Sequence, residues 1–508
     1  MDNREICFDI LKKIEDEDRF VDETLHLVLR RMQFSGKQDR AFITRLVEGI
    51  VERRITLDYI IEKFSSGKGK KNVKSDIRIL LQMGIYQIHF MEAVPNRAAI
   101  SETVEMVKRK GFSGLAGYVN ALLRKVAELS EEKKLDSYLV SRMDIRYSTP
   151  KWICDLLIKS YGKENAVKIL EDQFREHDTV IRCNLLKTDV DNLKAKLEAA
   201  GITVKPPFLS YESAGLKESE TSQDEDKLKM TDLPRLIPED EGIRDDQIQK
   251  RMLRISGYDI VSRIPGFRQG EFIIQDETSV YAISRIGIKP GDLVIDMCAA
   301  PGGKTLLAYE LTNGDGKCGK VISRDISESK LLKIKENAER MGFPVNDPES
   351  EEDIPAGIKL EMRDALENGD SSLGDSSLLE KADEGLADVV IADVPCSGLG
   401  VIGRKNDIKY HTSPEGAKSL AKQGLRILEN AFQLVKPGGR ICYSTCTINP
   451  EENGDVVHTF IEKQNHESET REEASEKNNK EKVRLLEEHT FLQGLDGSDG
   501  FYYAILEK

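Results

Sequence analysis

The sequence predicts a chain of three parts: an all-helical region, a small α+β module and an α/β domain with a doubly wound sheet. Apolar residues recur at helical spacing through the first 130 of the 508 residues. A strand, a helix and a second strand follow beyond about residue 145, and from Gly270 onward apolar strands alternate with helices. This alternation is typical of a mostly parallel sheet with helices on both faces. We therefore divide the chain into 1–130, a linker 131–144, 145–269 and 270–508.

The helical region is expected to contain about five helices, the later ones over the apolar runs near 41–61, 77–90, 98–107 and 115–129. It carries 23 basic and 19 acidic residues. A basic run at a helix end is commonly a solvated surface that the helix dipole favours, but two clusters in one small domain favour RNA binding. The clusters are Lys68, Lys70, Lys71 and Lys74 in a Gly/Ser stretch, and Lys108, Arg109 and Lys110.

The elements of the other two parts follow from apolar and β-branched runs that lie between turn residues. The small module is expected to contain a strand over 180–184, a helix over 189–200 and a strand over 201–204. The end of the chain, 491–493 and 500–506, predicts an antiparallel pair at the edge of the large sheet. The five parallel strands expected in that sheet are 293–297, 321–324, 358–362, 389–392 and 440–444.

The formal net charge of −14 argues against nucleic-acid binding when it is taken over the whole chain. The distribution of charge reverses this interpretation. Three acidic windows carry −6 (211–250), −11 (344–388) and −2 (464–482), so the remaining residues carry +5. The windows are polar and poor in aromatic residues, which is typical of solvated surface insertions. The rest of the chain is therefore compatible with an RNA partner.

Several classes of protein are excluded by what the sequence lacks. No segment approaches the roughly 18 uncharged apolar residues that span a membrane, and the N-terminus lacks the pattern of a secretory signal. We therefore expect a cytoplasmic protein with no membrane partner. The 8 cysteines form no C-x-x-C pair, which favours free thiols and argues against a metal site.

A glycine-rich loop follows the first strand of the α/β domain. It lies at the carboxyl edge of the sheet, where such domains bind cofactors, and its small residues let the backbone approach a ligand. A phosphate-binding Walker A loop is rejected, because that motif requires glycine where Cys298 stands. The loop consists of Cys298, Ala299, Ala300, Pro301, Gly302, Gly303 and Lys304.

An aspartate follows each of the next three strands. Asp325 lies where an acidic side chain can accept hydrogen bonds from ribose hydroxyls. Asp364 could contact an adenine edge, although a helix N-cap is an equally plausible role for it. With Asp393 after the fourth strand, the series favours a crevice that binds a nucleoside cofactor.

Two cysteines lie in polar loops at the ends of neighbouring strands, Cys396 after the fourth and Cys446 after the fifth. A buried cysteine is generally only a small apolar residue, and Cys442 inside the fifth strand fits that description. Because adjacent parallel strands bring their carboxyl ends together, we expect Cys396, Cys446, Asp393 and the glycine loop to share one crevice.

Three motifs resemble those of the Sun/Fmu family of S-adenosylmethionine-dependent RNA cytosine-5 methyltransferases. Their order, their spacing and the preceding Gly266-Phe267 and Gln275-Asp276 also fit this family. The resemblance covers about 145–508, and a NusB-like helical domain ahead of it is the arrangement of the bacterial ribosomal small-subunit methyltransferase B group. One departure is the segment from Gly403 to Tyr410, where relatives often carry Arg-Arg-x-Pro. The motifs are DMCAAPGGKT (296–305), DVPCSGLG (393–400) and YSTCTINPEEN (443–453).

The resemblance implies a Rossmann-like S-adenosylmethionine methyltransferase domain and a covalent mechanism. Carbon 5 of cytosine is too weak a nucleophile to take a methyl group unaided, and addition of a thiolate to carbon 6 activates it. The family implies Cys446 as the nucleophile and Cys396 as the helper in product release, whereas DNA cytosine methylases attack with the thiol that corresponds to Cys396. Asp393 would bind the cytosine edge at N3 and N4, and Lys304 would favour the thiolate or position the base. The cofactor would contact the loop from Cys298 to Lys304, Asp325, Asp364 and Asp393.

The sequence therefore predicts an RNA cytosine-5 methyltransferase that acts on 16S ribosomal RNA during ribosome biogenesis and uses S-adenosylmethionine. We expect a monomer, with ribosomal RNA as its partner. An enzyme of the same class that acts on transfer RNA is the near alternative. A different class, a non-catalytic RNA-binding or antitermination factor, is also considered. It is disfavoured because a scaffold needs neither the two thiols nor the glycine loop.

Overall fold

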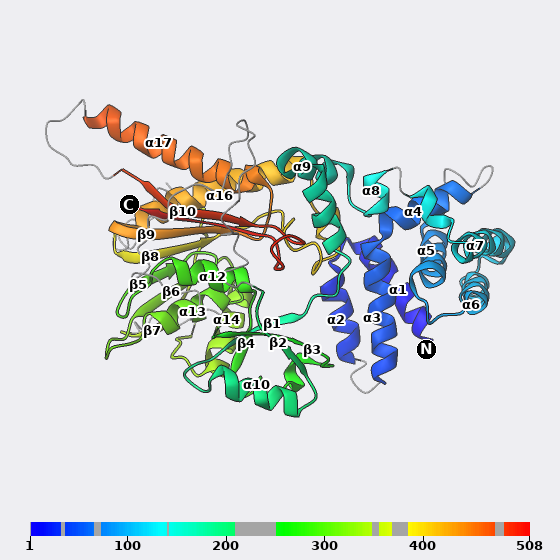
Figure 1. Cartoon of the computed structure of the whole chain (residues 1–508), viewed down its shortest axis with the longest axis horizontal. Coiled ribbons are helices and arrows are strands. Elements are labelled where there is room, and N and C mark those ends of the chain that lie inside the picture. Colours follow the sequence, from blue (N-terminus) through cyan, green and yellow to red (C-terminus); the bar gives the residue numbers. More distant parts are fainter. Residues whose placement is uncertain are drawn as a thin grey trace, which may run out of the picture. The chain divides into compact units, whose positions relative to one another are not determined.

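The computed structural model describes two compact units of the chain (Figure 1). One consists of Met1–Arg175 and Ile402–Thr412, and the other of Glu176–Val401 and Ser413–Lys508. Most of the three acidic windows, together with Lys68, Lys70 and Lys71, lies outside the described residues. The described residues are 2–31, 36–65, 73–139, 142–208, 250–347, 355–367, 385–472 and 482–508.

The first unit is helical, as predicted, but the expected number of helices was too low. Within the described residues up to Glu131 there are seven α-helices rather than about five. The apolar run 41–61 is two helices, because the backbone leaves helical geometry at Arg53 (φ −100°, ψ 14°), whose guanidinium lies 3.2 Å from the centre of the Phe174 ring. The helices are α1 (Asn3–Glu17), α2 (Val21–Arg31), α3 (Lys37–Glu52), α4 (Arg54–Phe64), α5 (Ser75–Phe90), α6 (Asn96–Arg109) and α7 (Ala116–Glu131), followed by α8 (Met143–Arg146) and α9 (Lys151–Asp172).

Helix α5 is the centre of this unit. Every residue from Ile79 to Ile88 is buried, because α1, α3, α4, α6 and α7 all pack against it. A helix that is buried on all sides in this way is found in the interior of helical domains. Gly49 on α3 permits a close approach, since a β-carbon there would overlap the ring of Tyr86. The core of the helical unit is therefore organised around one helix.

The second basic cluster of this region is largely occupied by ion pairs within the unit. Lys108 contacts Glu105 at 2.6 Å, Arg109 contacts Glu5 at 3.2 Å, and Lys110 contacts Asp9 at 3.1 Å. Lys110 also lies 4.4 Å from the centre of the Phe8 ring. These contacts favour the interpretation that the cluster is a solvated helix end, and they weaken the argument for RNA binding at this place.

The segment Ile402–Thr412 belongs to the helical unit although it lies far away in the sequence. Its Lys409 side chain is fully buried and donates hydrogen bonds to the Glu52 carbonyl oxygen (3.0 Å) and to Gln173 Oε1 (2.9 Å). The Asp407 carboxylate accepts a hydrogen bond from the backbone N–H of Val21 at 2.6 Å. The stretch that departs from the family pattern thus has a structural role, with its lysine inside the protein.

The stability of the helical unit is expected to rise with pH because of Lys409. Burial lowers the pKa of this lysine to about 7, with Glu52 opposing the shift. The unfolded chain, with an ordinary lysine pKa of about 10.4, therefore binds more protons between pH 7 and pH 10, and folding becomes more favourable as pH rises. We expect Lys409→Met to flatten this dependence. Melting temperatures of wild type and variant from pH 6.5 to 9.5 test it, and parallel curves would contradict it.

The second unit begins with a small four-stranded antiparallel sheet in the order β2-β3-β1-β4. The predicted strands and helix of this module are confirmed. Two further strands were missed because they are short and follow the long acidic window, and β4 lies beyond residue 269, where we began the α/β domain. The elements are β1 (Thr179–Cys183), α10 (Val190–Ala199), β2 (Thr203–Lys205), β3 (Met252–Ser256) and β4 (Phe272–Ile274).

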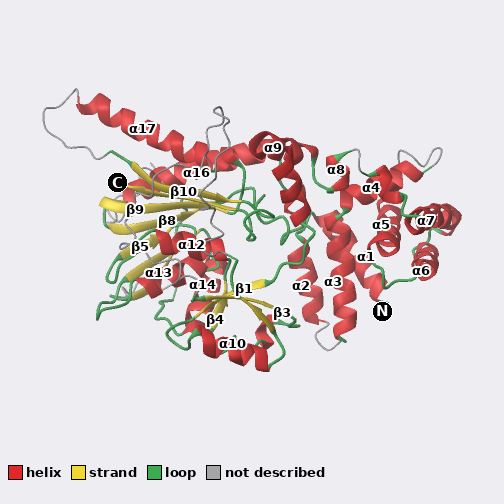
Figure 2. Ribbon diagram, in the orientation of Figure 1, coloured by secondary structure: helices red, strands yellow, loops and turns green. Residues whose placement is uncertain are grey.

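Within the described residues the larger sheet has seven strands in the order β10-β11-β9-β8-β5-β6-β7. Figure 2 shows the strands of the structure in yellow. The five strands predicted to be parallel are parallel, and β11 and β10 add an antiparallel pair at one edge. This antiparallel pair was predicted, but its first strand, β10, begins at Arg484 rather than at the predicted residue 491. The strands are β5 (Leu293–Asp296), β6 (Lys320–Asp325), β7 (Gly357–Met362), β8 (Ala387–Asp393), β9 (Val435–Thr445), β10 (Arg484–Phe491) and β11 (Phe501–Glu507).

Helices cover both faces of this sheet, and alternate strand residues enter two separate cores. Val294 packs in the core beneath one group of helices, and its neighbour Ile295 packs in the core on the other side. The doubly wound α/β architecture is confirmed, and the carboxyl ends of β5, β8 and β9 lie side by side. One face carries α12 (Glu277–Arg285), α13 (Gly303–Leu311) and α14 (Glu328–Met341), and the other carries α16 (Pro414–Leu434) and α17 (Gly454–Glu472).

Candidate active site

The glycine-rich loop leads from β5 directly into α13. Gly302 precedes the helix with φ 105°, a conformation that residues with a β-carbon rarely adopt, and a β-carbon there would lie 3.1 Å from Ile334. The fully buried Asp296 accepts a hydrogen bond from Thr305 Oγ1 at 2.7 Å, which ties the end of β5 to the first turn of α13. Burial raises the pKa of Asp296 to about 7. The loop is thus fixed at both ends.

Asp325 supports this loop from the end of β6. Its Oδ2 accepts a hydrogen bond from the backbone N–H of Ala300 at 3.0 Å, and its Oδ1 lies 3.0 Å from Lys330 Nζ. Asp364, after β7, accepts a hydrogen bond from the N–H of Leu366 at 2.9 Å and closes a turn. The structure therefore places Asp325 against the glycine loop, whereas Asp364 makes a contact within its own turn.

The structure brings the two predicted thiols into contact. The sulfur of Cys396, after β8, lies 3.3 Å from the sulfur of Cys446, after β9. This proximity follows from the parallel register, in which Asp393 is paired with Ser444. The neighbouring Cys446 sulfur, together with burial, holds the pKa of the Cys396 thiol well above its usual range. The raised pKa favours the protonated form of Cys396, and either sulfur can be the donor in this contact.

Lys304 and Asp393 form an ion pair beside the thiols, with Lys304 Nζ 2.7 Å from Asp393 Oδ2. Ser444 Oγ donates to the other carboxylate oxygen, also at 2.7 Å. Burial disfavours the charge on Lys304, but the Asp393 carboxylate outweighs burial and raises the lysine pKa. The negative charge of a Cys446 thiolate acts on Lys304 in the same direction. The raised pKa favours the charged form of Lys304 near the predicted nucleophile.

A buried carboxylate that sequence reasoning missed joins the two thiol-bearing loops. Glu452 is 1% exposed and accepts hydrogen bonds from the N–H of Ser397 (2.7 Å), from Ser397 Oγ (2.5 Å) and from Asn449 Nδ2 (2.9 Å). Ser397 Oγ also lies 2.9 Å from Thr447 Oγ1. Burial raises the pKa of Glu452, and these hydrogen bonds partly offset the rise. Its position within the third motif (443–453) was the feature of the sequence that could have identified it.

The two loops also touch through their backbones at Gly400. Its N–H donates to the carbonyl oxygen of Cys446 at 3.1 Å, and its own carbonyl oxygen accepts from the N–H of Gly500 at 2.8 Å. A β-carbon on Gly400 would collide with the backbone of Gly500 and would lie 2.8 Å from the Cys446 carbonyl oxygen. The loop that carries Cys396 can approach Cys446 only because this residue has no side chain.

Gly400→Ala is expected to separate the two thiol loops and to lower the rate of methyl transfer by about a hundredfold, the scale for a displacement of about 1 Å at a reacting group. The melting temperature should also fall, because backbone atoms on both sides must shift. Single-turnover kinetics and thermal melts measure both effects. Gly117→Ala in α7 serves as the control, since this glycine has a helical backbone and a β-carbon there would meet no atom within 4 Å. Wild-type turnover in Gly400→Ala would contradict the expectation.

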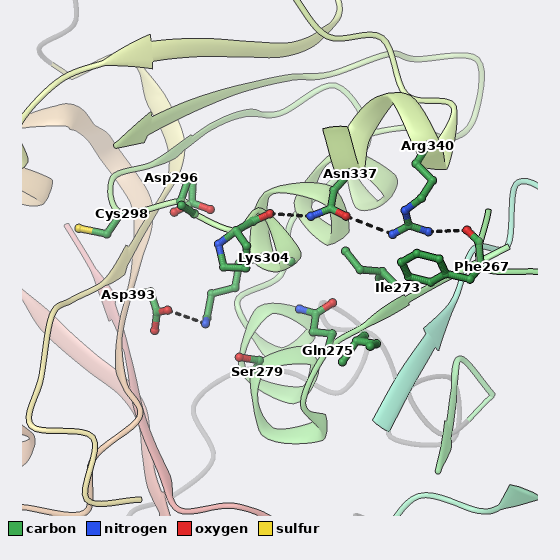
Figure 3. Close-up of a pocket in the computed structure, with 15 residues that line it drawn as sticks. Phe267, Ile273, Gln275, Ser279, Asp296, Cys298, Lys304, Asn337, Arg340 and Asp393 are labelled. Atoms are coloured by element: carbon green, nitrogen blue, oxygen red, sulfur yellow. Dashed lines mark hydrogen bonds and ion pairs between the residues drawn. The ribbon is translucent and has the colours of Figure 1, made fainter. Parts of the chain in front are cut away.

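A cavity of about 310 Å³ opens beside Lys304 and Asp393 (Figure 3). It extends from this ion pair to Asn337 and Arg340 on α14, and it touches both the small antiparallel sheet and the glycine loop. Asp325 and Asp364 are not among its lining residues. The lining consists of Phe267, Ile273, Ile274, Gln275, Ser279, Asp296, Cys298, Ala299, Ala300, Pro301, Gly303, Lys304, Asn337, Arg340 and Asp393.

The described parts of the chain contain no group of three or more His, Cys, Asp or Glu side chains that is arranged to hold a metal ion. No helix in them is both long and apolar enough to cross a membrane. All eight cysteines are free thiols.

Known proteins share this arrangement over the length of the chain. Family models match residues 1–128 (NusB family), 149–218 (a ferredoxin-like domain of RsmF/B-like methyltransferases) and 285–507 (16S rRNA methyltransferase RsmB/F). The probable ribosomal RNA small subunit methyltransferase B of Bacillus subtilis strain 168 is 31% identical over 513 residues, which cover 99% of this chain and 98% of the relative. The chain belongs to the ribosomal RNA small subunit methyltransferase B family.

Other members of this family are similar over nearly the whole chain. The probable enzyme of Synechocystis strain PCC 6803 is 28% identical over 99% of both chains, and the Vibrio cholerae enzyme is 27% identical over 93% of this chain and 90% of its own. In fold alone, the chain is also similar to the crystal structure of PH0851, which covers 99% of this chain and 97% of its own with a TM-score of 0.68 and 20% identity. The predicted order of a NusB-like domain, a small α+β module and a methyltransferase domain is confirmed.

Proposed function

We propose that this protein transfers a methyl group from S-adenosylmethionine to carbon 5 of a cytosine in small-subunit ribosomal RNA through a covalent bond to Cys446. The observation that carries the proposal is the meeting of two thiols, 3.3 Å apart, beside the Lys304–Asp393 ion pair at the carboxyl edge of the sheet. Membership in the family supports RNA methylation. The thiol pair supports cytosine as the target base and carbon 5 as the methylated atom, because methylation at this carbon requires a thiolate.

The residues at the sheet edge fit S-adenosylmethionine. The loop from Cys298 to Gly303 presents backbone close to the crevice, with no side chain at Gly302 or Gly303, and Asp325 lies against it. We propose that this loop, Asp325 and Asp393 hold the cofactor, with Asp364 near the adenine end. When bound, the cofactor supplies the electrophilic methyl group.

The two thiols, Lys304 and Asp393 have separate roles in the reaction. The Cys446 thiolate adds to carbon 6 of cytosine, while Asp393 binds the polar edge of the base and Lys304 stabilises the nearby negative charge. Carbon 5 then takes the methyl group and gives its proton to a base from the solvent, after which the carbon–sulfur bond breaks and the Cys446 thiolate is regenerated. The protonated Cys396 thiol, held against Cys446 Sγ, assists this last step. The target base must be unstacked to enter the crevice.

Transfer of isotope-labelled methyl groups to RNA tests the proposal. Purified protein is incubated with labelled S-adenosylmethionine and, separately, with transcripts of small-subunit ribosomal RNA and bulk transfer RNA, followed by mapping of 5-methylcytosine. Label at cytosine carbon 5 of the ribosomal transcript is expected. Label only in transfer RNA would show that transfer RNA, not ribosomal RNA, is the substrate. Label at an atom other than carbon 5 would overturn the proposed mechanism. Absence of methyl transfer would favour a non-catalytic RNA-binding factor.

A further inference from the structure

We propose that Gln275 is an RNA-binding residue, whose carboxamide N–H groups donate to an oxygen acceptor of the nucleotide in the cavity beside Lys304. This inference rests on the proposed function, since it assigns one more contact to the same substrate. It starts from a buried donor without a partner. Gln275 is 7% exposed, and its Nε2 has no hydrogen-bond partner among the described residues.

The orientation of the carboxamide is fixed by Arg182. This arginine is fully buried on β1, forms an ion pair with Glu310, and donates from Nε to Gln275 Oε1 at 2.7 Å. Because a guanidinium can only donate, the oxygen of Gln275 must face Arg182 and the nitrogen must face the other way. The Arg182–Glu310 pair thus acts as a support that presents an amide donor in one direction.

That direction is the cavity. Gln275 lines it together with Lys304, and Figure 3 shows the side chain between Lys304 and Ile273. A β-carbon at Gly303 would lie 3.3 Å from Gln275 Nε2, so the amide rests against the residue that precedes Lys304. An unpartnered donor inside a protein is unfavourable unless a ligand satisfies it. The amide is therefore placed to bind a molecule that also reaches Lys304.

The loop from Cys298 to Gly303, proposed to hold the cofactor, lines one side of the cavity, and the opposite side is suited to a nucleotide of the RNA. Asp325, expected to bind the cofactor, does not line it. The far wall consists of Phe267, with the Arg340 guanidinium 4.2 Å from its ring centre, and apolar side chains beside them. An aromatic–arginine pair with neighbouring amide donors suits a base and its oxygen acceptors.

Gln275→Glu tests the inference with little change in shape. A glutamate keeps an oxygen for Arg182 and replaces the free donor by an acceptor, which would repel an acceptor of the ligand. The dissociation constant for a small-subunit ribosomal RNA transcript is expected to rise about tenfold or more, while that for S-adenosylmethionine stays within about twofold. Gln269→Glu is the matched control, because it adds the same charge at an exposed position outside the cavity.

Each other result decides the question. Loss of cofactor affinity with unchanged RNA affinity would assign the cavity to S-adenosylmethionine, and unchanged binding of both would leave Gln275 with a structural role; both overturn the inference. If Gln275→Glu does not fold, Gln275→Met removes the donor without charge and should still weaken RNA binding at least threefold. If wild type transfers no methyl group but Gln275→Glu still loses RNA affinity, the proposed function fails and the RNA contact stands.

Discussion

Cys446→Ala is expected to lower methyl transfer by several orders of magnitude and to abolish any covalent protein–RNA complex. Without a thiolate to add to carbon 6, carbon 5 remains too weakly nucleophilic to accept the methyl group. RNA and cofactor affinities should change little, because the deleted atom forms no bond in the ground-state complex. Labelled-methyl transfer and denaturing gels measure the two losses, and Cys318→Ala, at an exposed cysteine, provides the control.

Cys396→Ala is the counterpart of this prediction and should act later in the cycle. Addition and methyl transfer can still occur, but release is slowed because the neighbouring protonated thiol is gone. The methylated RNA should therefore accumulate on Cys446 as a slowly migrating complex that resists denaturants. The reverse pattern, with the complex in Cys446→Ala and none in Cys396→Ala, would make Cys396 the nucleophile. Full activity in both variants would refute the covalent mechanism.

The convergence of Cys396, Cys446, Asp393 and the glycine loop was predictable because it depends only on strand order. Parallel strands with apolar runs are recognisable in sequence, and their carboxyl ends must lie at one edge of the sheet. The register that brings Asp393 opposite Ser444 turns this general rule into contact between two sulfur atoms. The spacing of the motifs was therefore enough to predict which of these residues converge.

Contacts between residues distant in sequence were not predictable in the same way. Lys409 lies in a polar stretch of the sequence, yet it is buried in the helical unit, where Glu52 and Gln173 accept its hydrogen bonds. The orientation of Gln275 depends on Arg182, 93 positions earlier, and on the burial of both side chains. A single sequence shows which residues are polar, but it does not show which polar residues are buried together.

Glu452→Gln is expected to lower the rate of methyl transfer by about a hundredfold while RNA and cofactor affinities stay nearly unchanged. Three hydrogen-bond donors from Ser397 and Asn449 point at this carboxylate. A glutamine of the same size offers one oxygen and turns an NH₂ group toward donors, so at least one bond is lost. The Cys396 loop should then shift relative to Cys446, and a displacement of about 1 Å costs roughly a hundredfold in rate. The free energy of unfolding should fall by about 1–3 kcal/mol.

A second measurement separates this positioning role from a loss of folding. With the two sulfurs 3.3 Å apart, mild oxidation should link Cys396 and Cys446 in the wild type, and the rate of disulfide formation reports their distance and alignment. Glu452→Gln should slow it, whereas Glu451→Gln, which changes an exposed neighbour, should alter neither this rate nor methyl transfer. A Glu452→Gln protein with wild-type turnover and wild-type disulfide formation would show that the carboxylate only fills space. A variant that melts normally yet loses both would establish that Glu452 holds the nucleophile and its partner thiol in register.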